Sequence, residues 1–141
     1  MRKLMVLSLM IIMVLSSASF GYGQVINDSI APCFVSVLYY SNSFDIDENG
    51  NATFSLMVYP LNRDLPDQVK ATVKIINKST GAVSYNQTLN LPYVYLYDQF
   101  RISDSHTLTQ SGIYEFQVTY KCYGDGVLLE TITANPQLDS F

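Results

Sequence analysis

His106 is the one histidine of this chain, and a hydrolytic triad needs a histidine base beside its nucleophile. It stands in S-D-S-H-T, next to Asp104 and Ser105, so all three residue types of a triad occur together. Adjacent residues do not make a triad, however, because its members must meet through space in a set geometry. The segment is more typical of a solvated turn. We therefore expect that the protein is not an enzyme and that it uses no cofactor.

A second group of chemically capable residues lies at Asp45, Asp47 and Asn49, in D-I-D-E-N-G. This spacing matches the first half of a calcium loop, in which alternating oxygens wrap the ion. The twelfth position of such a loop carries a bidentate glutamate, and here it is Leu56. The segments on both sides alternate like strands, whereas calcium loops of this kind join helices. The sequence thus offers a candidate metal site, but it favours a polar hairpin turn without a metal, and exposed turn carboxylates lack the burial that acid–base catalysis needs.

Three tyrosines, Tyr93, Tyr95 and Tyr97, occur in P-Y-V-Y-L-Y-D and would project to one side of a strand. A row of tyrosines is suited to stacking on sugars or anchoring a protein partner. The alternative is that this set packs in the core while Val94 and Leu96 face solvent. Because tyrosine keeps a polar tip, we expect the tyrosines to point outward and treat them as a candidate ligand-binding site.

The elements that must position these residues are strands. Apolar and polar residues alternate with a period of two over residues 33–40, 52–59, 69–75, 83–89, 93–97, 100–102, 114–122 and 127–133. Turn signals recur every 8–12 residues between them, and no segment has the length and period of a crossover helix. The sequence predicts an all-β, antiparallel sandwich of seven to eight strands.

The first residues resemble a signal peptide. Arg2 and Lys3 precede an apolar run over residues 4–15, followed by small residues. We expect cleavage within residues 1–23, which leaves one domain over residues 24–141, secreted into the extracellular space. Removing two of the eight basic residues leaves six against twelve acidic ones, a net charge of −6. Such a charge disfavours nucleic acid and anionic membranes as partners.

Two cysteines, Cys33 and Cys122, remain in this exported chain, and an oxidising compartment favours their pairing. The alternative is two separate buried thiols.

The segment L-T-Q-S-G-I-Y-E-F, residues 108–116, resembles the start of strand F in an immunoglobulin domain. The resemblance implies that Tyr114 is a tyrosine-corner residue, whose hydroxyl bonds to upstream backbone. Phe54 and Phe116 stand where that family has its inter-sheet cysteines. The same topology implies that Cys33 and Cys122 lie at one end of the sandwich, within reach of a disulfide.

The whole mature chain also resembles small secreted immunoglobulin-like proteins of Gram-positive gut bacteria. I-A-P at residues 30–32, N-G-N-A-T at 49–53 and E-T-I-T at 130–133 carry this likeness. That group has no established biochemical role to transfer. We therefore expect a secreted, non-enzymatic binding or adhesion-type module for a protein or carbohydrate outside the cell. The alternative is a structural or envelope-associated protein without a specific small ligand.

Overall fold

The structure, a computed structural model, describes residues 36–62 and 64–141. It is all-β, with nine antiparallel strands: β1 Val37–Ile46, β2 Asn51–Pro60, β3 Gln68–Asn77, β4 Val83–Leu91, β5 Tyr93–Val94, β6 Gln99–Thr107, β7 Ile113–Gly124, β8 Val127–Thr133 and β9 Gln137–Ser140. Within these residues no helix is long and apolar enough to cross a membrane. The expected signal peptide, residues 1–23, lies outside the described residues, as does Cys33.

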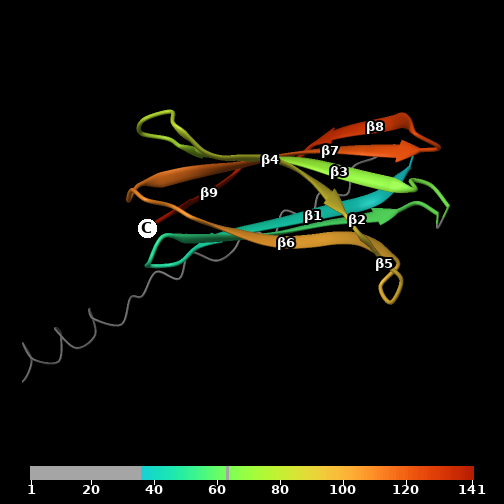
Figure 1. Cartoon of the computed structure of the whole chain (residues 1–141), viewed down its shortest axis with the longest axis horizontal. Helices are drawn as coiled ribbons and strands as arrows, with labels where there is room; N and C mark the ends of the chain where they lie inside the picture. The colour runs from blue at the N-terminus through green and yellow to red at the C-terminus, as the bar shows by residue number, and fades with distance from the viewer. Residues whose placement is uncertain (1–35, 63) are drawn as a thin grey trace, which may run out of the picture.

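The strands form two sheets that lie face to face (Figure 1). One sheet has the order β1-β2-β6-β5. The other has the order β4-β3-β7-β8, and β9 continues along the same edge of β7 as β8. The prediction of an antiparallel, all-β sandwich is therefore confirmed.

The core lies between the sheets, where the period-two pattern of the sequence places apolar side chains. On β3, Val69, Ala71, Val73 and Ile75 are fully buried, and on β7 the inward set runs from Tyr114 to Cys122. The inward residues of β2 are also buried. These strands follow the predicted alternation because each sheet packs one face against the other sheet. Apolar side chains on that face are removed from water, which stabilises the fold.

The two phenylalanines of β2 and β7 meet between the sheets. The ring centroids of Phe54 and Phe116 lie 5.3 Å apart, and Phe44 of β1 stacks on Phe116 at 4.7 Å. Beside them, the hydroxyl of Tyr114 donates to the carbonyl of Gln110 at 2.6 Å. This bond ties the β6–β7 connection to the start of β7. Aromatic rings thus fill the inter-sheet space at this level of the core.

The structure has nine strands rather than the seven to eight predicted, because the alternation did not indicate β9, and it differs from the predicted strands elsewhere as well. β1 continues through Asp45 to Ile46, so the turn after it is shorter than expected. A bulge between Val37 and Tyr39 shifts the alternation, which makes Val37 and Tyr40 the buried residues. The S-D-S-H-T segment, expected to be a turn, belongs to β6, since its residues pair with β2 as far as Thr107.

Candidate functional site

The Tyr93–Tyr97 segment is a hairpin tip, not the continuous strand that the alternation predicted. β5 contains only Tyr93 and Val94, and the chain then turns back into β6 with Asp98 at a φ of 50°. The amide of Tyr97 donates to the carbonyl of Val94 at 3.1 Å, which closes the turn. The three tyrosines therefore do not share one face of a strand. The reason is the tight turn itself, which no alternation of apolar and polar residues signals.

The turn gives the three tyrosines different surroundings. Tyr93 is half-buried, packs edge-on against Phe100 and Tyr95 with centroids 5.0 Å away, and donates its hydroxyl to Asp98 at 3.1 Å. Tyr95 is 86% exposed and Tyr97 is 53% exposed. Leu96, which was expected on the opposite side, is 81% exposed as well. The tip is therefore a largely apolar projection. Tyr93 packs it against β6, and residues 95–97 are exposed to solvent.

Two other turns lie at the same end of the sandwich. β2 ends there at Pro60, next to the start of β1 and close to the start of β6, because Val37 pairs with Pro60 and Val58 with Phe100. The loop after β2 is joined to the β7–β8 turn by Asp67, whose amide donates to Tyr123 at 3.0 Å. Its carboxylate accepts the amide of Asp125 at 2.8 Å. In Figure 1 the three turns project from the right-hand end of the molecule.

We call this end the loop end and define it by the β2–β3 loop, the β5–β6 turn, the β7–β8 turn and the start of β1. Of the eleven large hydrophobic side chains exposed in the described part of the chain, eight lie there: Leu38, Leu61, Leu65, Tyr95, Leu96, Tyr97, Val127 and Leu128. Four aspartates accompany them: Asp64, Asp67, Asp98 and Asp125. Scattered exposed apolar residues are ordinary, but their concentration at one end is typical of an interaction site.

The sequence did not predict the loop end, because its members are up to 90 positions apart. One signal was present. Leu61, Leu65, Val127 and Leu128 are apolar residues in or beside turns, where polar residues are the rule. Only the strand order brings these turns together.

The calcium-loop residues are divided between a strand and a turn. Asp45 lies on the outer face of β1, opposite Thr53. Asp47 holds the hairpin turn, since its Oδ1 accepts the amides of Asn49 and Asn51, each at 2.9 Å. In the described chain no cluster of three His, Cys, Asp or Glu side chains has a metal-binding arrangement. The bonding of Asp47 is that of a polar hairpin turn.

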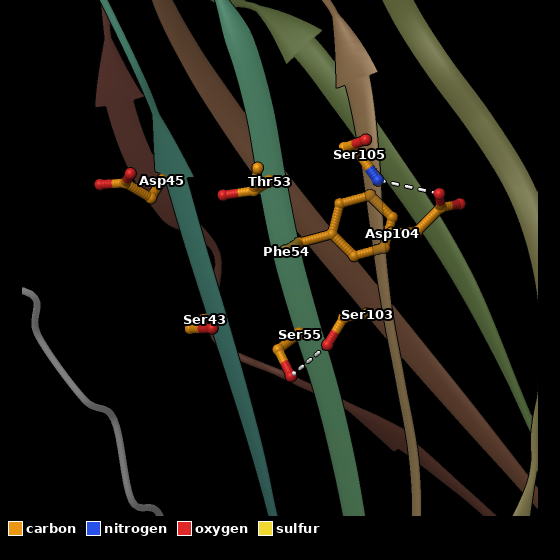
Figure 2. A pocket seen from close by; sticks show the side chains of 8 residues that line it. All are labelled: Ser43, Asp45, Thr53, Phe54, Ser55, Ser103, Asp104 and Ser105. Atoms are coloured by element: carbon orange, nitrogen blue, oxygen red, sulfur yellow. Dashed lines mark hydrogen bonds between the residues drawn. The ribbon is translucent and has the colours of Figure 1, made fainter.

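Asp45 instead lines a shallow groove on the outer face of the β1-β2-β6 sheet (Figure 2). The groove has a volume of about 530 Å³, and its lining is rich in hydroxyls: Ser43, Asp45, Thr53, Phe54, Ser55, Ser103, Asp104 and Ser105. The cross-strand register produces this surface, because Ser43, Ser55 and Ser103 form one row. The hydroxyls of Ser103 and Ser55 bond to each other at 3.2 Å. Much of the hydrogen-bonding capacity of the groove is therefore open to solvent.

Asp104, Ser105 and His106 do not assemble a triad. Successive residues of β6 point to opposite faces, so the side chain of Ser105 faces the outer groove, whereas the His106 ring contacts β4. Asp104 lies at the border, where it lines the groove and also reaches β4. The Tyr85 hydroxyl donates to Asp104 at 3.0 Å, and the His106 ring lies 5.3 Å from the Tyr85 ring. Burial, followed by the hydrogen bond and the negative charge of Asp104, raises the pKa of Tyr85 to about 12. These contacts join β4 to β6 across the two sheets. The alternation of β6 is what keeps Ser105 apart from His106.

Cys122 is fully buried on the inner face of β7, and its disulfide partner in our prediction, Cys33, lies outside the described residues. Burial, followed by the nearby charge of Glu130, raises the pKa of the Cys122 thiol to about 12, and the neighbouring Ser36 side chain partly offsets this. Ser36 also donates its hydroxyl to Glu130 at 3.0 Å. Cys33 is three positions before Ser36 in the sequence. The disulfide between Cys33 and Cys122 stays a prediction.

Comparison of the chain with protein-family models gave no match, and comparisons with curated proteins and with solved structures gave none either.

Proposed function

We propose that this chain is a secreted, non-enzymatic binding module of immunoglobulin-like architecture, which contacts a protein partner outside the cell through its loop end. The observation that carries the proposal is the exposure of Tyr95 and Leu96 at the tip of the β5–β6 hairpin. Export rests on the leader sequence alone. The remaining support comes from the strand order, the chemistry of the tips and the arrangement of the titratable side chains.

The strand order supports the immunoglobulin-like assignment. Sheets ordered β1-β2-β6-β5 and β4-β3-β7-β8 correspond to the A-B-E-D and C′-C-F-G sheets of that architecture. The bond from Tyr114 to upstream backbone is the one that its tyrosine corner makes. Phe54 and Phe116 stand in place of its inter-sheet disulfide and make a ring contact there.

The chemistry of the loop end favours a protein as the partner. Tyrosine is enriched among the residues that contribute most to binding, because a rigid ring buries much apolar area at little entropic cost. Removing apolar surface from water contributes about 25 cal/mol for each Å². The aspartates around the tips would form a polar rim, which favours a partner with basic groups around an apolar centre. Carbohydrate, the other expected ligand class, is better matched to the hydroxyl-lined groove.

The arrangement of titratable side chains supports a role without catalysis. His106 packs on Tyr85, and Ser105 points away from it into the outer groove. Asp45 and Asp47 sit on a strand face and in a turn, respectively. Nucleophilic or acid–base catalysis would need such groups within hydrogen-bonding reach of one another.

The test compares the wild-type exported protein with two variants, each labelled with a fluorophore and applied to intact Gram-positive gut bacteria and to a glycan array. The double variant Tyr95→Ala, Leu96→Ser removes the tip. Its control is Ile113→Ser, which removes a 52% exposed residue at the opposite end, where β7 begins. We expect the tip variant to lose about tenfold or more in affinity for bacteria while the control binds normally. Equal binding by both variants would refute the loop end as the contact site. Absence of binding by the wild type would favour the structural alternative.

A further inference from the structure

β4 forms an outer edge of its sheet and has the features of an edge strand that can pair with a strand of another molecule. It runs for nine residues, Val83–Leu91, and contains neither a charged residue nor a proline. Within residues 36–62 and 64–141, β3 is the strand that pairs with it, so one side of its backbone has no strand neighbour. Such an edge presents a row of amides and carbonyls that can accept another strand.

The other edges carry the devices that prevent strand pairing. Side chains from β9 cover the β1 edge: Asp139 accepts the amide of Ile46 at 2.6 Å, and Gln137 donates to the carbonyl of Asn42 at 2.8 Å. The β8–β9 edge is interrupted at Pro136 and bears charges at Glu130 and Asp139. β5 is only two residues long. Charges, prolines, short strands, bulges and covering groups are the usual protection of an edge. β4 has one irregularity, at Ser84 near its first residue, and residues 85–91 pair with β3 without interruption.

We propose that two copies of this chain associate through antiparallel pairing of their β4 strands, which joins the two β4-β3-β7-β8 sheets into one continuous sheet. The proposal is independent of the function proposed above. It commits to a second copy because the sequence of β4 is complementary to itself in this orientation.

The self-complementarity appears when two β4 strands are aligned with Gln87 opposite Gln87 of the second copy. Tyr85 then faces Leu89, so an aromatic ring meets an aliphatic side chain, and beyond the irregularity at Ser84 the apolar Val83 comes to the level of Leu91. On the other face Asn86 meets Thr88, and Ser84 meets Asn90. Such cross-strand pairs, aromatic with aliphatic and amide with hydroxyl, are favourable.

The charges permit this association although the protein is acidic overall. Three charged residues lie next to β4: Lys70 and Lys74 on β3, beside Asn90 and Asn86, and Asp104 on β6, which accepts the Tyr85 hydroxyl. In the proposed alignment, the cross-strand row that starts at Lys74 contains Asn86 of the same copy and then Thr88 and Thr72 of the second copy. Lys74 therefore has no charged residue of the second copy in its row. Like charges separated by more than about 8 Å are largely screened at physiological ionic strength.

The geometry has a consequence for the whole assembly. Antiparallel pairing relates the two copies by a twofold axis across the strands, so their loop ends point in opposite directions. A dimer would therefore present two identical contact surfaces, one at each end.

The test uses the position on the twofold axis. Gln87→Lys places two ammonium groups opposite each other, and Gln87→Glu places two carboxylates opposite each other. We expect sedimentation velocity to give a dimer for the wild type at about 100 μM, a concentration at which a micromolar Kd leaves most chains paired. Each variant alone should be monomeric, and an equimolar mixture should recover the dimer, because lysine then faces glutamate.

Ser103→Lys, on the outer face of the other sheet, is the control and should remain dimeric. A monomeric wild type at this concentration would overturn the proposal, and so would a Gln87→Lys variant that dimerises like the wild type. Failure of the mixture to recover the dimer would overturn the proposed alignment. Circular dichroism of each variant verifies that the sandwich is intact, which separates lost pairing from lost folding.

Discussion

Removing the hydroxyl of Tyr114 tests whether the turn into β7 is held by a side-chain bond. Tyr114→Phe keeps the ring, which is 1% exposed and stacks against Phe141, and deletes the 2.6 Å bond to the Gln110 carbonyl. A net hydrogen bond contributes about 1 kcal/mol, and an acceptor left without a partner adds a further cost. Gln110 itself is exposed, so water can reach part of this carbonyl. We therefore expect a loss of about 1–2 kcal/mol in the free energy of unfolding.

Urea denaturation followed by far-ultraviolet circular dichroism measures this loss, and the melting temperature should fall by about 5 °C. The matched control is Tyr85→Phe, which deletes a 3.0 Å bond to the exposed Asp104. Because Asp104 remains solvated, this variant should lose about 0.5 kcal/mol or less. If Tyr85→Phe destabilises the protein as much as Tyr114→Phe, the reasoning that burial sets the cost of each hydroxyl is wrong.

Three further predictions follow from the core. Phe116→Ala should lower the free energy of unfolding by about 3–5 kcal/mol in urea, because the ring is fully buried between Phe54 and Phe44; a loss below about 1 kcal/mol would show that the site collapses or is not packed. Stability should fall as the pH rises above about 10, because burial raises the pKa of Tyr85 to about 12 and that of Tyr120 further, so the folded state keeps protons that the unfolded state releases; melting temperatures that are constant from pH 9 to pH 12 would contradict this sign. Peptide mapping without reduction should give a Cys33–Cys122 linked peptide. Two thiols that can be alkylated in the unfolded, unreduced protein would show that the disulfide is absent.

Much of the fold was predictable from the sequence, because in long strands the side-chain period is a local property. Val69 to Ile75 alternates cleanly with lysine and threonine, and the structure buries the apolar set completely. The same holds for Tyr114 to Cys122. Where the backbone departs from regular extension, this argument failed: the bulge before Tyr39 shifted the buried positions, and the turn after Val94 ended a strand that the tyrosines had suggested.

The candidate sites were less predictable, because they depend on which strands become neighbours. Ser105 and His106 are adjacent in sequence, yet the pleat of β6 sends them to opposite faces. Asp47 looked like a metal ligand, but its carboxylate is used by the amides of its own turn. In both cases local spacing named residues of the right type, and backbone geometry decided what they contact.

The amino-acid sequence by itself determined the all-β class, the inward faces of the central strands and the positions of most turns, since these follow from alternation and from residues that favour turns. The tertiary structure decided that three turns carrying Leu, Tyr and Val lie at one end, that serines from three strands form one groove, and that β4 has a strand neighbour on one side only among the described residues. Pairing between strands far apart in the chain produced each of these surfaces. Such pairing is set by the packing of the whole core and has no local signature in the sequence.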